Sequence, residues 1–298
     1  MGKLKIQPIP KKMKKRNISP TMEVVLRLTR NKAAMVGMFI FILVAVTSLI
    51  APLFIDYQAR CIAQNMGLRF QKPSAQFWFG TDAFGRDVFA RVVYGARISL
   101  FLGLVSTTIS AVIGTFFGVL AGYLEGKMDT TIMRIMDTFM AIPGMIFMLA
   151  IVATMGTSIP VLLFAVVMVQ VPSFTRLVKS AVLTVSGQEY IEAAKAHGAL
   201  APRIILKYVL PNAMGPIIVH VSMSVAMMIV VMASLSFIGM GVQPPTPEWG
   251  LMLMEAKEYL RFAPQLMFYP GLAIVITALS INLFGDGLRD ALDPKLKD

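Results

Sequence analysis

The sequence is poor in charged residues and has almost no cysteine or histidine. Asp, Glu, Lys and Arg make up 15% of its 298 residues, whereas soluble domains are about a quarter charged. With one cysteine, Cys61, no disulfide framework can form within the chain, and two histidines do not supply a conventional zinc site. Hydrophobic residues make up 56% of the chain, so the composition indicates an integral membrane protein, and we expect its fold to be all-α.

The familiar motifs of catalysis are also missing. The pattern GxxxxGK[ST] does not occur, because the Gly126-Lys127 pair lacks the upstream glycine and the following Ser or Thr. Neither HExxH nor GxSxG is present, and Asp137 is the sole acidic residue predicted inside a span. We therefore expect no enzyme, no metal site and no cofactor in this chain, and an energy source in a separate protein.

The net charge of +12 is concentrated at the N-terminus. Ten Lys and Arg residues and one acid, Glu23, lie in the first 32 residues. A basic segment just before an apolar span is typical of cytoplasmic retention and of contact with anionic lipid, rather than of nucleic-acid binding. Residues 1–32 are therefore predicted to form a cytoplasmic tail.

Six apolar segments are long enough to cross a bilayer, which takes about 20 residues. The first is 23 residues long, longer than the core of a cleaved signal, and the third contains Pro143, which can kink it. The segments are 33–55, 98–124, 131–154, 159–178, 214–238 and 266–284. The chain is accordingly divided into the tail, residues 33–97 with the first span and an outer loop, a five-helix core at 98–287, and a C-terminal tail at 288–298.

An even number of spans puts both termini on one side, and the distribution of charge identifies that side. Of the 28 Lys and Arg residues, 20 belong to the side of the two tails and 8 to the outer segments at 56–97 and 239–265. Positive charge accumulates on the cytoplasmic side of a membrane. Both termini, and the segment between the fourth and fifth spans, are therefore predicted to be cytoplasmic.

That segment, 188–211, reads QEYIEAAKAHGALAPRIILKYVLP and is too polar and too broken to cross a membrane. A first short helix would end at Gly198, which suits the left-handed position after a helix. Pro202 can begin a second short helix, and Leu210-Pro211 would end it. A water-exposed helical hairpin between two spans favours a docking surface over packing filler.

Several small or polar residues stand out within the spans. The second span carries small residues at strict four-residue spacing, which lets another helix approach closely: Ser106, Ser110, Gly114, Gly118 and Gly122. Other polar groups at membrane depth either line a passage or bond to neighbouring helices: Gln170, Ser222, Ser224, His220 and Asn282. The 23 methionines would suit a soft metal, but adaptable packing is the better interpretation.

The outer loop contains WFGTDAFGRDVFARVVYGAR. Gly80 and Gly85 permit tight turns. Asp82 and Asp87 are natural helix caps, and a helix is expected from Val88 into the second span. The other outer segment contains GVQPPTPEWG, whose prolines favour a rigid extended turn.

The hairpin resembles the EAA motif of membrane subunits of ATP-binding-cassette importers. That motif reads EAA, three residues, Gly, nine residues, a usual Ile, one residue and Leu-Pro, and here Tyr208 replaces the Ile. In that family the first helix docks into a groove on an ATPase subunit. The resemblance implies that Glu192 makes a polar contact, that the two alanines allow close approach and that Gly198 makes the turn. The coupling residues it implies are Glu189, Glu192, Ala193, Ala194, Gly198, Leu210 and Pro211.

Two further stretches, FGTDAFGRDVFARVVYGARISL and LSINLFGDGLRDALDPKLK, are similar to the C-type membrane subunit of dipeptide and oligopeptide importers. The resemblance implies the type I importer permease fold, with six spans and a cytoplasmic coupling helix between spans four and five. It also implies that the outer motif contacts a binding protein or a second subunit through Gly80, Thr81, Asp82, Gly85, Arg86 and Asp87.

The mechanism implied by the resemblance is alternating access in a bacterial or archaeal plasma membrane. This chain would pair with a homologous second membrane subunit, and two ATPase subunits, which carry ATP and Mg, would bind the hairpins. An extracytoplasmic binding protein would deliver the substrate. A peptide is the preferred substrate, with nickel, glutathione or another small solute as alternatives. An ion-coupled secondary carrier is a remote alternative, because intramembrane acids and histidines are few.

Overall fold

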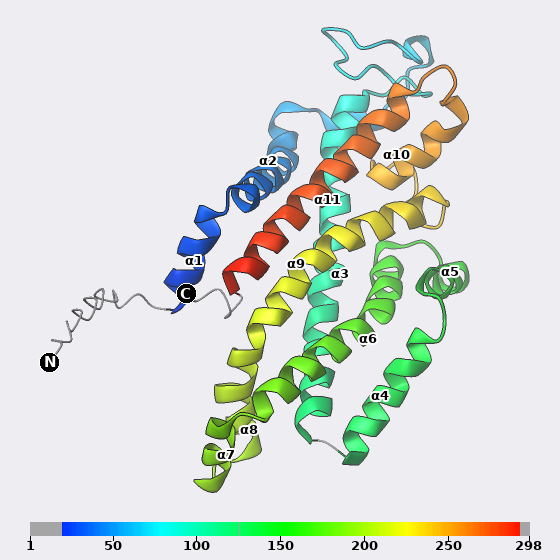
Figure 1. The fold of residues 1–298 in the computed structure, drawn as a ribbon. Coiled ribbons are helices and arrows are strands. Elements are labelled where there is room, and N and C mark those ends of the chain that lie inside the picture. The colour runs from blue at the N-terminus through cyan, green and yellow to red at the C-terminus, as the bar shows by residue number, and fades with distance from the viewer. Residues whose placement is uncertain (1–19, 125, 293–298) are drawn as a thin grey trace, which may run out of the picture.

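The computed structural model describes residues 20–124 and 126–292, which form a bundle of helices (Figure 1). In this part of the chain the strand pattern is limited to one isolated bridge, between Thr81 and Asp87. The predicted all-α class is therefore confirmed. The outermost parts of the two predicted tails, 1–19 and 293–298, lie outside the described residues.

Six crossings of a membrane can be made by these helices. Five segments are long and apolar enough, and they contain α2 (Lys32–Phe54), α3 (Val88–Leu124), α6 (Ile159–Ser186), α9 (Leu210–Phe237) and α11 (Gln265–Leu292). The sixth crossing needs two helices together, α4 (Gly126–Met140) and α5 (Gly144–Met155), which are bent by 80° at their junction. By length and composition five of the six predicted spans are present as single helices, and the sixth is present only as the bent pair α4–α5.

The third span is broken rather than kinked, so the prediction of one helix at 131–154 is wrong. α4 ends at Met140, and α5 begins at Gly144 after Pro143, which has φ −54° and ψ 124°. Proline lacks an N–H and disfavours the helical conformation of the residue before it, so the helix stops ahead of Pro143. The proline in the sequence indicated where the bend lies. The angle of the bend depends on the packing of α5 against α6.

The second helix of the hairpin does not end at Leu210-Pro211, contrary to the prediction. α8 (Ala201–Ile204) continues through a π-helical stretch, Ile205–Val209, directly into α9. The Leu210 N–H bonds to the Ile205 carbonyl, five residues earlier, and Pro211 falls in the first turn of α9. Because the wide turn shifts the hydrogen-bond register by one residue, the chain passes this proline without leaving the helix.

Two other helices extend beyond their predicted ends. α6 runs about two turns past residue 178, to Ser186. α11 continues to Leu292, into a segment predicted to be a polar tail. Its glycines lie at helix contacts there, since a Cβ added at Gly285 would lie 3.0 Å from Ser222 Oγ. A helix that the sequence did not predict, α1 (Pro20–Arg30), packs beside the same end of α11 (Figure 1).

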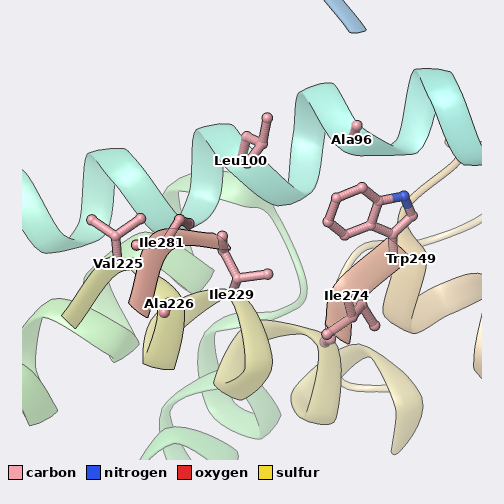
Figure 2. Packing of buried hydrophobic residues seen from close by; sticks show 9 residues of the cluster. Ala96, Leu100, Val225, Ala226, Ile229, Trp249, Ile274 and Ile281 are labelled. Carbon is pink, nitrogen blue, oxygen red and sulfur yellow. The ribbon is translucent and has the colours of Figure 1, made fainter. Parts of the chain in front are cut away.

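α3 is the central element of the bundle, with α2, α6 and α9 packed around it (Figure 1). A buried cluster joins α3 to α9, α11 and α10 (Trp249–Ala256), with Trp249 pointing toward α3 (Figure 2). The indole Nε1–H of Trp249 donates to the Val92 carbonyl at 2.9 Å, so its one polar group is satisfied. The cluster consists of Ala96, Leu100, Val225, Ala226, Ile229, Ala233, Trp249, Ile274 and Ile281.

The small-residue ridge of α3 lies partly against α6. Its three glycines stand where added Cβ atoms would clash with three side chains of α6: Phe174, Val178 and Val182. Its two serines are fully buried and donate to carbonyls one turn earlier, Ser106 to Leu102 at 2.6 Å and Ser110 to Ser106 at 2.7 Å. Small side chains at this spacing allow the two helices to approach closely.

The outer loop and the hairpin stand at opposite ends of the bundle (Figure 1). The outer end contains η1 (Tyr57–Ile62), η2 (Met66–Leu68), α10 and η4 (Lys257–Tyr259), and the other end contains α7 (Glu189–Ala196) and α8. The extended turn was predicted only for GVQPPTPEWG, and the rest of the segment 239–265 is not extended. It includes the short buried helix α10, which the prolines alone did not indicate.

Candidate functional site

The first helix of the hairpin begins and ends where the sequence predicts. Gln188 precedes α7, and Gly198 follows it with φ +78°, in the left-handed region. A Cβ added at Gly198 would meet no atom within 4 Å. The glycine is therefore required by the backbone conformation of the turn and not by a lack of space.

Three buried aliphatic side chains fix the hairpin to the bundle. Ile191, Ile204 and Val209 are at most 1% exposed. They pack in one cluster with side chains of α3, α6 and α9: Val119, Val178, Val182, Ala213 and Ile217. Because close-packed interiors resist deformation, a displacement of the hairpin also displaces the ends of these three helices.

The other side of the hairpin is exposed. Most of the predicted coupling residues lie there: Glu189, Glu192, Ala193, Gly198 and Pro211 are exposed, and Ala194 and Leu210 are half-buried. Three large apolar side chains are exposed on the same segment: Tyr190 by 44%, Leu200 by 76% and Leu206 by 67%. Apolar groups exposed among charged ones are typical of an interaction surface.

The outer motif folds into tight turns ahead of α3. Gly80 and Gly85 have φ +77° and +75°, and a Cβ added at Gly85 would overlap the carbonyl oxygen of Asn65. Thr81 is fully buried, and its hydroxyl accepts from the Gln71 N–H at 2.9 Å. The outer motif is therefore held against the preceding part of the loop by this hydrogen bond and by close backbone packing.

Only one of the two predicted aspartate caps exists. The Asp87 carboxylate accepts from the N–H of Ala90 at 3.3 Å, in the first turn of α3. Asp82 does not cap a helix, contrary to the prediction. Its Oδ1 accepts from the N–H groups of Phe84 and Arg86, both at 2.9 Å, so it closes a turn within the loop.

Two buried arginines share one glutamate at the outer end. The Nη2 atoms of Arg86 and Arg91 lie 2.8 and 2.9 Å from Oε2 of Glu255. Arg86 also donates to Asp82 at 2.6 Å, and Arg91 to the Cys61 carbonyl at 2.9 Å. The two arginines are 2% and 1% exposed. The network therefore fastens the outer loop and the start of α3 to α10.

Two glutamates of this end were not found from the sequence. Glu248 accepts from the N–H groups of Gly250 and Leu251 at 2.9 and 2.8 Å, and from the Ser99 hydroxyl at 3.0 Å. An acid directly ahead of a short apolar run was the available signal, since it suits a helix N-terminus. Glu255 offered no local signal, because its arginine partners lie 164 and 169 positions earlier.

Burial shifts two ionisable groups of the outer loop. It raises the pKa of the Cys61 thiol to about 12. Burial also raises the pKa of the Asp87 carboxyl, although the Ala90 N–H and Arg60 oppose the shift. A thiol that stays protonated is a poor nucleophile and a poor metal ligand, so Cys61 acts as a small buried packing residue.

A hollow of about 630 Å³ lies between α5, α6 and α9. Three of the polar residues predicted at membrane depth meet on its wall: Gln170, Ser224 and His220. The other two do not. Ser222 donates to the Val219 carbonyl and stands beside α11, while Asn282 is exposed on α11. The structure thus separates residues that the sequence could not distinguish.

Two ion pairs join α4 to α6. Asp137 lies 2.5 Å from Arg176, and Asp129 lies 2.6 Å from Lys179. Asp137, the acid predicted inside a span, therefore has a cationic partner. Both side chains of that pair are nearly half exposed, at 47% and 45%.

These features define a class of protein: a multi-span membrane protein with an exposed helical hairpin at one end and a hollow between its spans whose mostly apolar wall carries a few polar side chains. In residues 20–124 and 126–292 no three His, Cys, Asp or Glu side chains gather as ligands for a metal ion. The sequence model of the protein family described as "Binding-protein-dependent transport system inner membrane component" matches residues 114–298, more than half of the chain. The chain belongs to this family of importer permeases.

A second family model places the chain within the peptide branch. It is described as "N-terminal TM domain of oligopeptide transport permease C" and matches residues 19–73. The dipeptide transport system permease protein DppC of Alkalihalophilus pseudofirmus is 42% identical over 280 residues, 94% of this chain and 91% of the relative. The glutathione transport system permease protein GsiD of Pectobacterium atrosepticum is 43% identical over 270 residues, 91% and 89% of the two chains.

Solved structures establish the fold. Two inward-facing structures of the MetNI methionine ABC transporter match with TM-scores of 0.58 and 0.59. They cover 68% and 69% of this chain and 96% and 97% of their own, at 21% identity. The predicted type I importer permease fold is confirmed, and at this level of identity the likeness extends to the fold alone.

Proposed function

We propose that this chain forms half of the membrane pathway of an ATP-driven importer of small peptides. The observation that carries the proposal is the exposed hairpin, whose EAA pattern lies on α7 at the end of the bundle opposite the outer loop (Figure 1). The sequence has no phosphate-binding loop. ATP and Mg are bound by two partner ATPases, which dock on the hairpins of this chain and of a homologous second membrane subunit.

The orientation follows from charge. The side of the hairpin and of both tails holds 20 of the 28 Lys and Arg residues, which favours a cytoplasmic location for that side. The outer loop then faces an extracytoplasmic binding protein that delivers the substrate. The exposed Trp78 and the outer segments supply a surface for that contact.

The hairpin acts as the coupling element. On its exposed side, Glu192 makes a polar contact with the ATPase, while Ala193 and Ala194 allow close approach. On its buried side, Ile191 and Ile204 carry the movement of the ATPase into the ends of α3, α6 and α9. The rigid packing of the hairpin against α3, α6 and α9 therefore links movement of the ATPase to opening and closing of the pathway.

The proposed substrate class is a small solute that contains a peptide bond. The support is the name of the DppC relative, a dipeptide permease protein, and the extent of the match. Glutathione is the second candidate, because the GsiD relative is similar over nearly the same length. Both solutes contain amide-linked amino acids.

The test uses the complete importer, reconstituted in proteoliposomes with its second membrane subunit, ATPases and binding protein. Glu192→Arg reverses the charge on the exposed side of α7. We expect about a tenfold fall in both dipeptide uptake and dipeptide-stimulated ATP hydrolysis, because like charges or lost partners at an interface are costly. The matched control is Asp286→Arg, which reverses an exposed acid on α11, outside the hairpin. Unchanged uptake and hydrolysis in Glu192→Arg would refute the docking role.

A further inference from the structure

The hollow between α5, α6 and α9 has an uncharged wall rich in methionine. None of the residues that line it is Asp, Glu, Lys or Arg. Five are methionines, whose flexible side chains adapt to differently shaped neighbours: Met145, Met148, Met223, Met227 and Met228. The wall therefore does not discriminate between positively and negatively charged ligands. Its methionines can adapt to ligand side chains of different size.

Polar groups distinguish this hollow from a lipid-facing surface. Gln170, Ser224 and His220 lie on it. The exposed side of α2, by contrast, carries large apolar residues such as Phe39, Leu49 and Leu53. Polar side chains at membrane depth are costly against lipid and usually face the bundle interior or a path for a solute.

Gln170 is a buried polar residue of this hollow whose side chain lacks hydrogen-bond partners in the described part of the chain. Its side chain is 6% exposed, and within the described residues neither Oε1 nor Nε2 has a hydrogen-bond partner. In that part of the chain it is the only buried side chain with two unpartnered polar atoms. A buried donor and acceptor without partners destabilise the fold, so the residue is suited to a partner that arrives later.

We propose that Gln170 binds the backbone of the substrate as it passes through the hollow. Its carbonyl accepts from the peptide N–H, and its NH₂ group donates to the backbone oxygen of the same substrate residue. The amide is covered in this conformation, so contact requires a change of side-chain rotamer. The inference rests on the proposed function and deepens it, because dipeptides and glutathione share a peptide N–H and differ in charge and side chains.

The experiment measures initial uptake of radiolabelled alanyl-alanine and of glutathione by the reconstituted importer, with the substrate-loaded binding protein at saturation. Gln170→Leu keeps the size of the side chain and removes both hydrogen-bonding groups. We expect uptake to fall about five- to tenfold, the effect of losing one or two hydrogen bonds to the moving substrate. The melting temperature should stay unchanged or rise, because an unpaired polar group is replaced by an apolar one of similar volume.

The matched control is Thr107→Val. Thr107 on α3 is also buried and has an unpartnered hydroxyl within the described residues, but it does not line the hollow. Uptake by this variant should equal that of the wild type. Equal losses in Thr107→Val and Gln170→Leu would overturn the proposal, since any buried polar group would then have the same effect.

A second substrate tests whether the contact is direct. Alanyl-N-methylalanine lacks the peptide N–H that would donate a hydrogen bond to the Gln170 carbonyl. The wild-type importer should take it up more slowly than alanyl-alanine, and Gln170→Leu should remove that difference. A preference that persists in Gln170→Leu would contradict a direct contact.

The remaining outcomes separate this inference from the function on which it rests. If the wild-type importer takes up neither alanyl-alanine nor glutathione, the proposed substrate class is wrong, and the inference is wrong with it. If the wild type imports either solute and Gln170→Leu imports it equally fast, only the assignment of Gln170 is wrong. A loss of uptake that accompanies a lower melting temperature would make Gln170 a packing residue and also refute the assignment.

Discussion

Two ion-pair sites of the molecule are enclosed to different degrees. At the outer end Arg86 and Arg91 are almost completely buried, and both contact Glu255. Between α4 and α6, Asp137 and Arg176 form an ion pair, and both side chains are nearly half exposed. The outer network is enclosed by protein, whereas the pair between α4 and α6 is open to its surroundings.

The difference shows which of the two sites is built to hold its shape. Charges removed from solvent are tolerated only when several partners satisfy them, so the outer network fixes the loop, α3 and α10 in one arrangement. An exposed pair contributes less to stability and can be broken at smaller cost. Under the proposed function, this pair between α4 and α6 is the contact that can rearrange, while the outer end keeps its shape.

Neutralising one acid at each of the two sites should produce the largest contrast. Glu255→Gln leaves two buried arginines with one carboxylate partner fewer, and we expect the free energy of unfolding to fall by about 3 kcal/mol. Asp137→Asn removes an exposed pair and should lower it by no more than about 1 kcal/mol. Both values are measured by unfolding the purified importer in mixed micelles of increasing SDS content.

Glu258→Gln is the matched control for the outer variant. Glu258 lies three residues after Glu255, in η4, and is exposed. This variant should unfold like the wild type. Equal losses of unfolding free energy in Glu255→Gln and Asp137→Asn would mean that burial does not distinguish the two ion-pair sites, and the comparison would fail.

Glycine substitutions extend the comparison to the backbone. Gly198→Ala in the hairpin places a side chain at φ +78° without any steric contact, which should cost about 1–2 kcal/mol. Gly85→Ala at the outer end meets the same conformational cost and a clash with the Asn65 carbonyl, so its loss should be larger. SDS unfolding measures the two losses, and limited proteolysis shows whether the damage stays within the hairpin.

Gly271→Ala serves as the control for both variants. Gly271 lies inside α11, and an added Cβ there would make only an ordinary contact, 3.8 Å from Leu253 Cδ2. Alanine should therefore be neutral, or stabilise by up to about 1 kcal/mol through its higher helix propensity. If Gly85→Ala were no worse than Gly198→Ala, the outer end would be as adaptable as the hairpin.

The sequence predicted the class, five of the six spans and the first helix of the hairpin, because each depends on local signals. Long apolar runs indicate spans, and Gly198 marks the end of α7. The predictions failed where local signals were ambiguous. Pro143 divides a span, whereas Pro211 lies within a continuous helix, and the π-helical turn before Pro211 accounts for the difference. A proline in the sequence does not reveal which outcome the surrounding packing selects.

The hairpin part of the candidate site could also be predicted, because it too depends on local sequence signals. The hairpin residues belong to one short motif, so their exposure could be expected from polarity. The outer network could not be expected, since Glu255 and Arg91 are brought together only by the packing of α10 against α3. Gln170 and Asn282 were equivalent as polar residues within spans, and only the arrangement of α5, α6 and α9 places Gln170 on a hollow.

Cys61 provides the smallest and most local test of the outer end. Its side chain is fully buried in η1, and burial raises its pKa to about 12. Maleimide reacts with the thiolate, so the folded importer should label very little at pH 7 and still little at pH 9, where nearly all of the Cys61 thiol keeps its proton. Labelling should become complete once SDS has unfolded the protein. The reference is Ala75→Cys in a Cys61→Ala background, because Ala75 is exposed in the same loop and its thiol should label readily.

The direction of the pH effect follows from the raised pKa. A thiol with a higher pKa in the folded state keeps its proton there while the unfolded chain loses it, so the contribution of Cys61 to stability is complete below its ordinary pKa of 9.0 and is lost as pH rises toward about 12. Wild-type importer should therefore lose more stability between pH 9 and pH 11 than Cys61→Ala. Equal pH dependence in the two proteins, or rapid labelling of the folded wild type, would mean that the loop opens readily. The enclosed charge network would then not be what holds the outer loop closed.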